Sequence, residues 1–338
     1  MLPSIWLRNC VCALCLSSFW LGSHSGLAGE EILTGKDTLD VTPVAGDLGA
    51  MLAGLRWTPG EFPITVESAT KPDEPSVIRF PSPVPTGDEV NDRVALIWRK
   101  PINVDDDQLR PAIVVVHESG SAMPVGTLFA QSLAAQGVHT FMIHLPNYGL
   151  RRREGTRPSG ESFLLTMRQA IADVRRARDV AATMQGVDPQ RVALQGTSLG
   201  GFVSATVAGL DQAYDAIYIM LAGGDLVSLL ANGEKEAAQL RERLSKAGYS
   251  GDKLTEMLQF IEPTRLGSRM AGERIWLYSA DQDRVVPLAN TLALKSAAGI
   301  PDERHLRLPG THTSTILFFP VIVKHVVEHL PPPGVTTR

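Results

Sequence analysis

A serine lies between two glycines where an apolar run gives way to small residues. The stretch Val192–Gly201 reads VALQGTSLGG, with Ser198 flanked by Gly196 and Gly200. Between a strand and a helix, Gly-x-Ser-x-Gly makes a turn so tight that only glycine-sized neighbours avoid collision. The hydroxyl is then exposed above the sheet edge, and the N-terminus of the following helix favours negative charge there. The pattern predicts a nucleophile rather than a structural turn.

A serine nucleophile needs a base, and four histidines follow Ser198 in the sequence. His312 lies in LPGTHTST, between the last predicted strand and the last predicted helix, at the edge of the sheet where Ser198 is expected. His305 begins a strand and would lie at the opposite end. His325 and His329 fall in the last helix, where an isolated i, i+4 pair indicates a solvated face rather than a metal site. We predict that His312 is the base.

The third group of such a triad is a carboxylate that holds the imidazole in the correct tautomer. The segment YSADQDRVVP follows a predicted strand and contains Asp281 and Asp283. Asp283 is favoured because the apolar turn 285–287 after it can bury and fix the carboxylate. Asp281 is expected to hydrogen-bond its own loop, and Asp225, after the preceding strand, is the remaining alternative.

Two backbone N–H groups are needed to bind the oxyanion that forms during acyl transfer. One is expected from Leu199, which follows the nucleophile. The other is expected from the loop after the run IVVVH, where Ser119 is our choice and Glu118 the alternative. His117, at the start of this loop, is predicted to make a structural hydrogen bond.

These residues require a fold that brings the ends of several strands to one edge. From Ser76 onward, β-type runs alternate with helical ones, which predicts a doubly wound, mostly parallel eight-stranded sheet with helices on both faces. The expected strands are Ser76–Phe80, Arg93–Arg99, Ala112–His117, Thr140–Leu145, Arg191–Gln195, Ala216–Leu221, Arg274–Tyr278 and Arg304–Leu308. Ligands of such sheets bind at the carboxyl ends of the strands.

The remaining segments are assigned by composition. Residues 1–28 are predicted to be a signal peptide cleaved after Ala28, with an uncleaved membrane anchor as the alternative. They hold all three cysteines, so the mature chain would have none. Residues 29–75 are expected to form an extension lying over the catalytic domain 76–338, with a short helix at Met51–Trp57. Residues 223–272 are expected to be a helical insertion that caps the strand ends and shapes the substrate pocket.

Charge and composition limit the function classes. The 338 residues carry a formal net charge of -4, so the overall charge does not indicate a nucleic-acid-binding protein, which is typically basic. No apolar run after residue 28 is long enough to span a bilayer. The runs Arg151–Arg153 and Asp105–Asp107 are each predicted to be solvated charges. A secreted or periplasmic chain with no cofactor and no metal is expected.

The motifs resemble those of the α/β-hydrolase superfamily, in its dienelactone hydrolase-like and acetyl-xylan-esterase-like branch. VDPQRVALQGTSLGG, SADQDRVVP and PGTHTS are similar to that family's nucleophile, acid and histidine segments. Two positions depart from the family: dienelactone hydrolases have cysteine at the position of Ser198, and glycine is common at that of Glu118.

The resemblance implies a serine hydrolase that cleaves a small-molecule or carbohydrate ester of a carboxylic acid. A serine peptidase of the prolyl-oligopeptidase-like branch shares this catalytic domain and is an alternative. A non-catalytic binding protein of the same fold is a second alternative, and it would lack a member of the triad.

Overall fold

The computed structural model describes residues 29–71, 74–102, 108–153 and 159–333. In these ranges ten strands form one sheet: β1 (Glu30–Lys36), β2 (Glu61–Glu67), β3 (Ser76–Pro81), β4 (Arg93–Arg99), β5 (Arg110–Val116), β6 (His139–His144), β7 (Val187–Thr197), β8 (Ile217–Met220), β9 (Ile275–Ala280) and β10 (His305–Leu308). The α-helices are α1 (Gly46–Leu55), α2 (Glu89–Asp92), α3 (Pro124–Ala134), α4 (Phe163–Thr183), α5 (Leu199–Asp211), α6 (Leu226–Asn232), α7 (Glu236–Lys246), α8 (Gly251–Gln259), α9 (Leu288–Ala297) and α10 (Phe319–Glu328).

The sheet has a parallel part and an antiparallel part. Its strand order is β1-β2-β3-β4-β6-β5-β7-β8-β9-β10, and β5 to β10 are parallel to their neighbours within this group. Strands β1 to β4 pair antiparallel, and β4 joins them to β6. After Arg110, β5 is apolar and buried on both faces, which suits its place between β6 and β7 in the parallel part.

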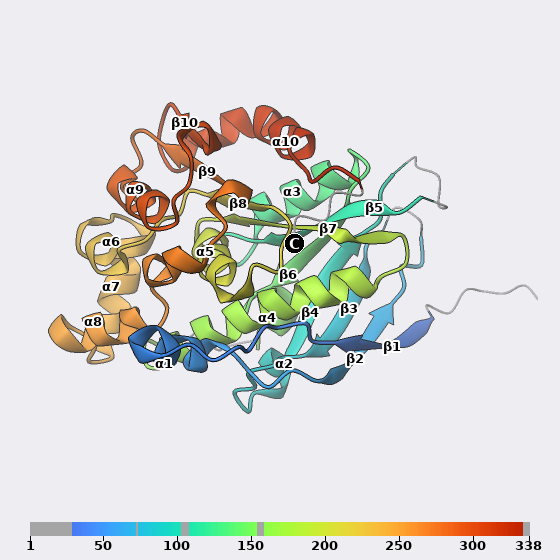
Figure 1. The fold of residues 1–338 in the computed structure, drawn as a ribbon, viewed down its shortest axis with the longest axis horizontal. Helices are drawn as coiled ribbons and strands as arrows, with labels where there is room; N and C mark the ends of the chain where they lie inside the picture. Colours follow the sequence, from blue (N-terminus) through green and yellow to red (C-terminus); the bar gives the residue numbers. More distant parts are fainter. Residues whose placement is uncertain (1–28, 72–73, 103–107, 154–158, 334–338) are drawn as a thin grey trace, which may run out of the picture.

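Helices cover both faces of the sheet, as expected (Figure 1). Helices α3 and α10 bury Phe129, Leu133 and Val326 in one core, while α1, α4 and α5 contribute to the larger core on the opposite face. Between β8 and β9 the chain forms α6, α7 and α8, which stack at one side of the molecule (Figure 1, yellow to orange). Among the described residues, no helix combines the length and apolar character needed to cross a bilayer.

The expected number of strands is wrong, since the described residues form ten rather than eight. The eight expected strands correspond to β3 to β10, and the other two come from the segment assigned to the N-terminal extension. That segment adds β1 and β2 to the sheet edge and packs α1 on α4. Its alternating pattern in β2, with Phe62, Ile64 and Val66 facing the core, is short and interrupted by Pro63, which weakens the sequence signal.

A buried ion pair and several hydrogen bonds hold this N-terminal segment against helix α4. Arg176 donates to both carboxylate oxygens of Asp37, at 2.8 and 2.7 Å. The backbone N–H and the hydroxyl of Thr38 donate to Asp179, at 2.9 and 2.6 Å. The segment is therefore joined to the domain by its sheet pairing, its apolar core residues and these charged contacts.

Arg151 is another buried charge, which corrects the expectation of a solvated arginine run. Its guanidinium is fully buried and pairs with the equally buried Asp173 at 2.8 Å. It also donates to the carbonyl oxygens of Asn91, at 2.8 Å, and of His144, at 3.0 Å. Arg152 and Arg153 are exposed as expected, whereas Asp105–Asp107 lie outside the described residues. A run of like charges gives no signal that one member faces a buried partner.

Arg151→Met is expected to destabilise the fold by about 3–5 kcal/mol, because it leaves Asp173 buried without its counter-charge. Arg153→Met is the matched control: its pair with Asp88 is largely exposed, so a change below about 1 kcal/mol is expected. Urea unfolding of the two variants measures both values. Equal stability of the two variants would show that the buried pair has no special role.

Candidate active site

Ser198 lies on a strained turn between β7 and α5. Its backbone angles are φ 52° and ψ -114°, a conformation that L-residues rarely adopt. A Cβ on Gly196 would lie 2.3 Å from the carbonyl oxygen of Gly200, and one on Gly200 would lie 2.2 Å from that of Val116. Both glycines are therefore required by close backbone contacts. The Ser198 N–H donates to Met220 in β8 at 2.8 Å, which fixes the turn to the sheet.

The structure brings Ser198, His312 and Asp283 together from three separate loops. His312 Nε2 is 3.2 Å from Ser198 Oγ, and His312 Nδ1 is 2.6 Å from Asp283 Oδ2. The Asp283 carboxylate is almost completely buried, while the imidazole remains partly accessible. At these distances His312 can accept the proton of the Ser198 hydroxyl, and the Asp283 carboxylate can orient the imidazole of His312.

Backbone hydrogen bonds hold the acid loop and the histidine loop side by side. Asp281 N–H donates to Leu308 at 2.9 Å, and Gln282 N–H donates to Gly310 at 2.8 Å. Within the acid loop, Asp283 Oδ1 accepts from the N–H groups of Val285 and Val286, at 2.8 and 2.9 Å. These two bonds leave Oδ2 directed at His312, which is the role that the apolar turn was expected to serve.

The other candidate acids have different partners. The Asp281 carboxylate forms a partly exposed ion pair with Arg307, at 2.7 Å, rather than bonding its own loop. Asp225 accepts from the N–H of Ser228 and so caps the start of α6. Neither carboxylate is bonded to His312.

The loop after β5 is fixed by His117 and Glu118. His117 Nδ1 donates to the Glu118 carbonyl oxygen at 2.6 Å, and Nε2 accepts from the Leu145 N–H at 3.1 Å. His117 is therefore structural, as expected. The Glu118 carboxylate accepts from the N–H groups of Val125 and Gly126 at the start of α3. The contacts position Ser119 beside the nucleophile.

Buried histidines make the stability of the fold sensitive to acid. Burial lowers the pKa of His117, His139 and His144 to about 4, from 6.5. Each ring accepts a hydrogen bond that needs an unprotonated nitrogen, such as that from Trp98 Nε1 to His139. As pH falls from about 6.5 to about 4, the unfolded chain gains protons that the folded chain does not bind, so the free energy of unfolding decreases.

We therefore expect the thermal midpoint to fall as the pH is lowered from about 6.5 to about 4. His139→Gln keeps an acceptor for Trp98 but cannot titrate, so its midpoint should depend less on pH. His329→Gln, at an exposed position, is the control and should follow the wild type. A wild-type midpoint that is constant over this range would contradict the argument.

The other described histidines, His305, His325 and His329, have no hydrogen bond to Ser198 or Asp283. His305 begins β10 and bonds Ser279 at 2.8 Å. His325 and His329 stack with ring centroids 4.0 Å apart, but His325 is half-buried against Trp276, so this face is only partly solvated, contrary to expectation. In the part of the chain that the structure describes, no group of three or more metal-ligating side chains is found.

Two cavities meet at Ser198. Cavity A, of about 430 Å³, is lined mainly by apolar residues of α4 to α8 and also by Ser119, Ser198 and Leu199. Cavity B, of about 340 Å³, is lined by Ser119 and Ser198 together with His312, Ile316 and Phe319. Ser119 and Ser198 belong to both, so a reacting group held at Ser198 has space on both sides.

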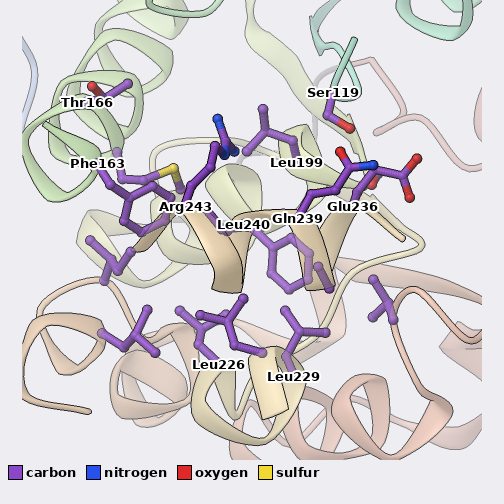
Figure 2. A pocket seen from close by; sticks show the side chains of 18 of the residues that line it. Ser119, Phe163, Thr166, Leu199, Leu226, Leu229, Glu236, Gln239, Leu240 and Arg243 are labelled. Atoms are coloured by element: carbon purple, nitrogen blue, oxygen red, sulfur yellow. The ribbon is translucent and has the colours of Figure 1, made fainter. Parts of the chain in front are cut away.

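Helix α7 contributes residues of cavity A that the sequence did not identify. Its cavity face carries Glu236, Gln239, Leu240 and Arg243, seen beside Ser119 and Leu199 in Figure 2. Leucines of α6 and α8, within the segment 223–272 that was expected to form a cap, are part of the apolar wall. Charged residues on an amphipathic helix usually face water, so the sequence alone gave no signal for the polar ones.

Solved structures of similar fold include esterases and peptidases. An acetyl xylan esterase from a Paenibacillus species is 14% identical, with a TM-score of 0.63 over 84% of this chain and 92% of that one. Acetyl xylan esterase 1 from a Thermoanaerobacterium species is 16% identical, with a TM-score of 0.61 over 83% and 92%. The acylaminoacyl peptidase of Pyrococcus horikoshii is 13% identical, with a TM-score of 0.55 over 87% of this chain and 45% of that one.

No protein-family model matches the sequence, and no curated protein is significantly similar to it. At such low identity the structural matches define the fold alone. The chain has the α/β-hydrolase fold, in agreement with the resemblance of its motifs.

Proposed function

We propose that the protein is a serine hydrolase that cleaves a carboxylic ester. The observation that carries the proposal is the Ser198–His312–Asp283 arrangement on a strained strand-to-helix turn that opens into two cavities. The similarity in fold to acetyl xylan esterases supports an ester substrate, a small molecule or an esterified carbohydrate.

The reaction would proceed through an acyl-enzyme. Ser198 Oγ attacks the ester carbonyl carbon while His312 Nε2 takes its proton, and Asp283 stabilises the imidazolium that forms. His312 then gives this proton to the leaving alcohol as the carbon–oxygen bond breaks. Water attacks the acyl-enzyme with His312 again as base, which releases the acid and restores Ser198. The scheme needs no cofactor.

The N–H groups of Leu199 and Ser119 are proposed to bind the oxyanion. Leu199 is the first residue of α5, where the helix dipole also favours negative charge. Ser119 borders both cavities beside Ser198, whereas Glu118 borders cavity B alone, which favours Ser119 as the second donor.

Peptide hydrolysis is the second candidate, favoured by the fold similarity to the acylaminoacyl peptidase. This chain spans less than half of that peptidase. A non-catalytic role is disfavoured, because the three triad residues are present and within hydrogen-bond distance. A secreted or periplasmic location is proposed from the apolar leader; residues 1–28 lie outside the described ranges.

A substrate panel tests the proposal. The purified protein is given p-nitrophenyl esters from acetate to decanoate and, in parallel, an aminoacyl-nitroanilide. Ester hydrolysis with little cleavage of the anilide supports an esterase. The reverse preference would assign the site to the peptidase alternative, and no turnover of either class would contradict both.

A further inference from the structure

The positions of the two cavities assign them to the two halves of an ester, and this step rests on the proposed function. The leaving alcohol must take its proton from His312 Nε2, and His312 lines cavity B but not cavity A. Cavity A borders the proposed oxyanion donors Leu199 and Ser119 without the base. The acyl group therefore extends into cavity A and the alcohol into cavity B.

Cavity A is mainly apolar, and its charged lining residues lie on helix α7. Leu226, Leu229 and Phe163 are typical of its walls, whereas Glu236 and Arg243 carry charges on the same helix face, seven residues apart. Figure 2 shows both side chains extending from α7 along the cavity, with Gln239 between them. An acyl group bound here meets a mostly apolar surface and very few charged groups.

Arg243 differs from the other two cations of α7, Arg241 and Lys246, because its guanidinium has no ion-pair or hydrogen-bond partner within the described residues. Arg241 donates to the carbonyl oxygen of Ala231 at 2.9 Å, and Lys246 pairs with Glu242 at 2.6 Å. Across the described ranges, the Arg243 guanidinium forms no ion pair and donates no hydrogen bond. Tyr148 also lines cavity A. Burial raises the pKa of its phenol, and the positive charge of Arg243 opposes that increase, so this charge is felt at the cavity wall.

We propose that Arg243 selects substrates whose acyl group has an apolar body and ends in a carboxylate, as in a half-ester of a dicarboxylic acid. The planar guanidinium offers paired N–H donors that match a carboxylate. The hydrocarbon part of the acyl group contacts the leucines and phenylalanine of cavity A. Glu236 also lines cavity B and so lies at the junction of the cavities, where it disfavours an anionic group close to the scissile ester.

Matched esters test this selection. The p-nitrophenyl half-esters of adipic and suberic acid are compared with p-nitrophenyl hexanoate and octanoate, and p-nitrophenyl 6-aminohexanoate supplies a cationic arm. We expect the wild type to have a higher kcat/KM for the half-esters than for the neutral esters. Arg243→Gln should lower the ratio of half-ester to neutral kcat/KM by about 10–100-fold, and Arg243→Lys should restore part of it.

Lys246→Gln is the matched control, because it removes one positive charge from α7 at a side chain that does not line either cavity. Its ratio should equal that of the wild type. The proposal is overturned if Arg243→Gln keeps the wild-type ratio, if neutral esters are preferred, or if the cationic ester is the best substrate. Absence of turnover with all five esters would instead contradict the proposed function itself, and the selection with it.

Discussion

Ser198→Ala is expected to lower ester turnover by about four orders of magnitude or more while the chain remains folded. The loss is large because the hydroxyl is the proposed nucleophile, and alanine at this position leaves no group that can attack the ester. The fold should tolerate alanine, since the backbone contacts around Gly196 and Gly200 and the hydrogen bond to Met220 do not use the side chain.

The measurement is kcat/KM with a p-nitrophenyl ester, together with the thermal midpoint of wild type and variant. Ser204→Ala is a suitable control: this serine is buried in α5 on the same Gly-rich segment, but it has no hydrogen bond to His312. Full esterase activity in folded Ser198→Ala would refute the role of Ser198.

Asp283→Asn is expected to lower turnover by roughly two to four orders of magnitude, because an amide favours the wrong imidazole tautomer and cannot stabilise the imidazolium. The backbone bonds from Val285 and Val286 can still reach the side-chain oxygen, so the loop should keep its conformation. Asp281→Asn is the matched control in the same loop. Its ion pair with Arg307 is partly exposed, so we expect near-normal turnover and a stability change below about 1 kcal/mol.

Turnover and thermal midpoint of both variants decide between the two aspartates. Loss of activity confined to Asp283→Asn supports the assignment. If Asp281→Asn is the inactive variant and Asp283→Asn is active, the acid has been assigned to the wrong residue.

The sequence predicted the parts of the site that depend on local patterns at the ends of strands. The glycines around Ser198 could be recognised because each is required by a backbone contact, and the strand-helix alternation placed His312 and Asp283 at the same edge. The apolar turn after Asp283 distinguished it from Asp281, since burial and backbone donors fix a carboxylate. These features require only the order of the elements and their neighbours in the sequence.

Features that depend on distant pairing were missed. The strand β2 contains Pro63 and lies between the edge strand β1 and β3, so its role appears only when all three strands are aligned. Arg151 is buried because Asp173, on α4, lies opposite it. In the same way, Arg243 lines cavity A because the helices after β8 border the same cavity as Ser198. Long-range contacts of this kind leave no periodic signal.

Labelling of the nucleophile tests the central claim most directly. The wild-type protein is incubated with a fluorophosphonate, which reacts with activated serines, and the adduct is located by peptide mass spectrometry. We predict one adduct, on Ser198, with labelling strongly reduced in His312→Ala and absent from Ser198→Ala. An unmodified Ser198, or an adduct on another serine that accounts for the ester hydrolysis, would contradict the assignment of this site.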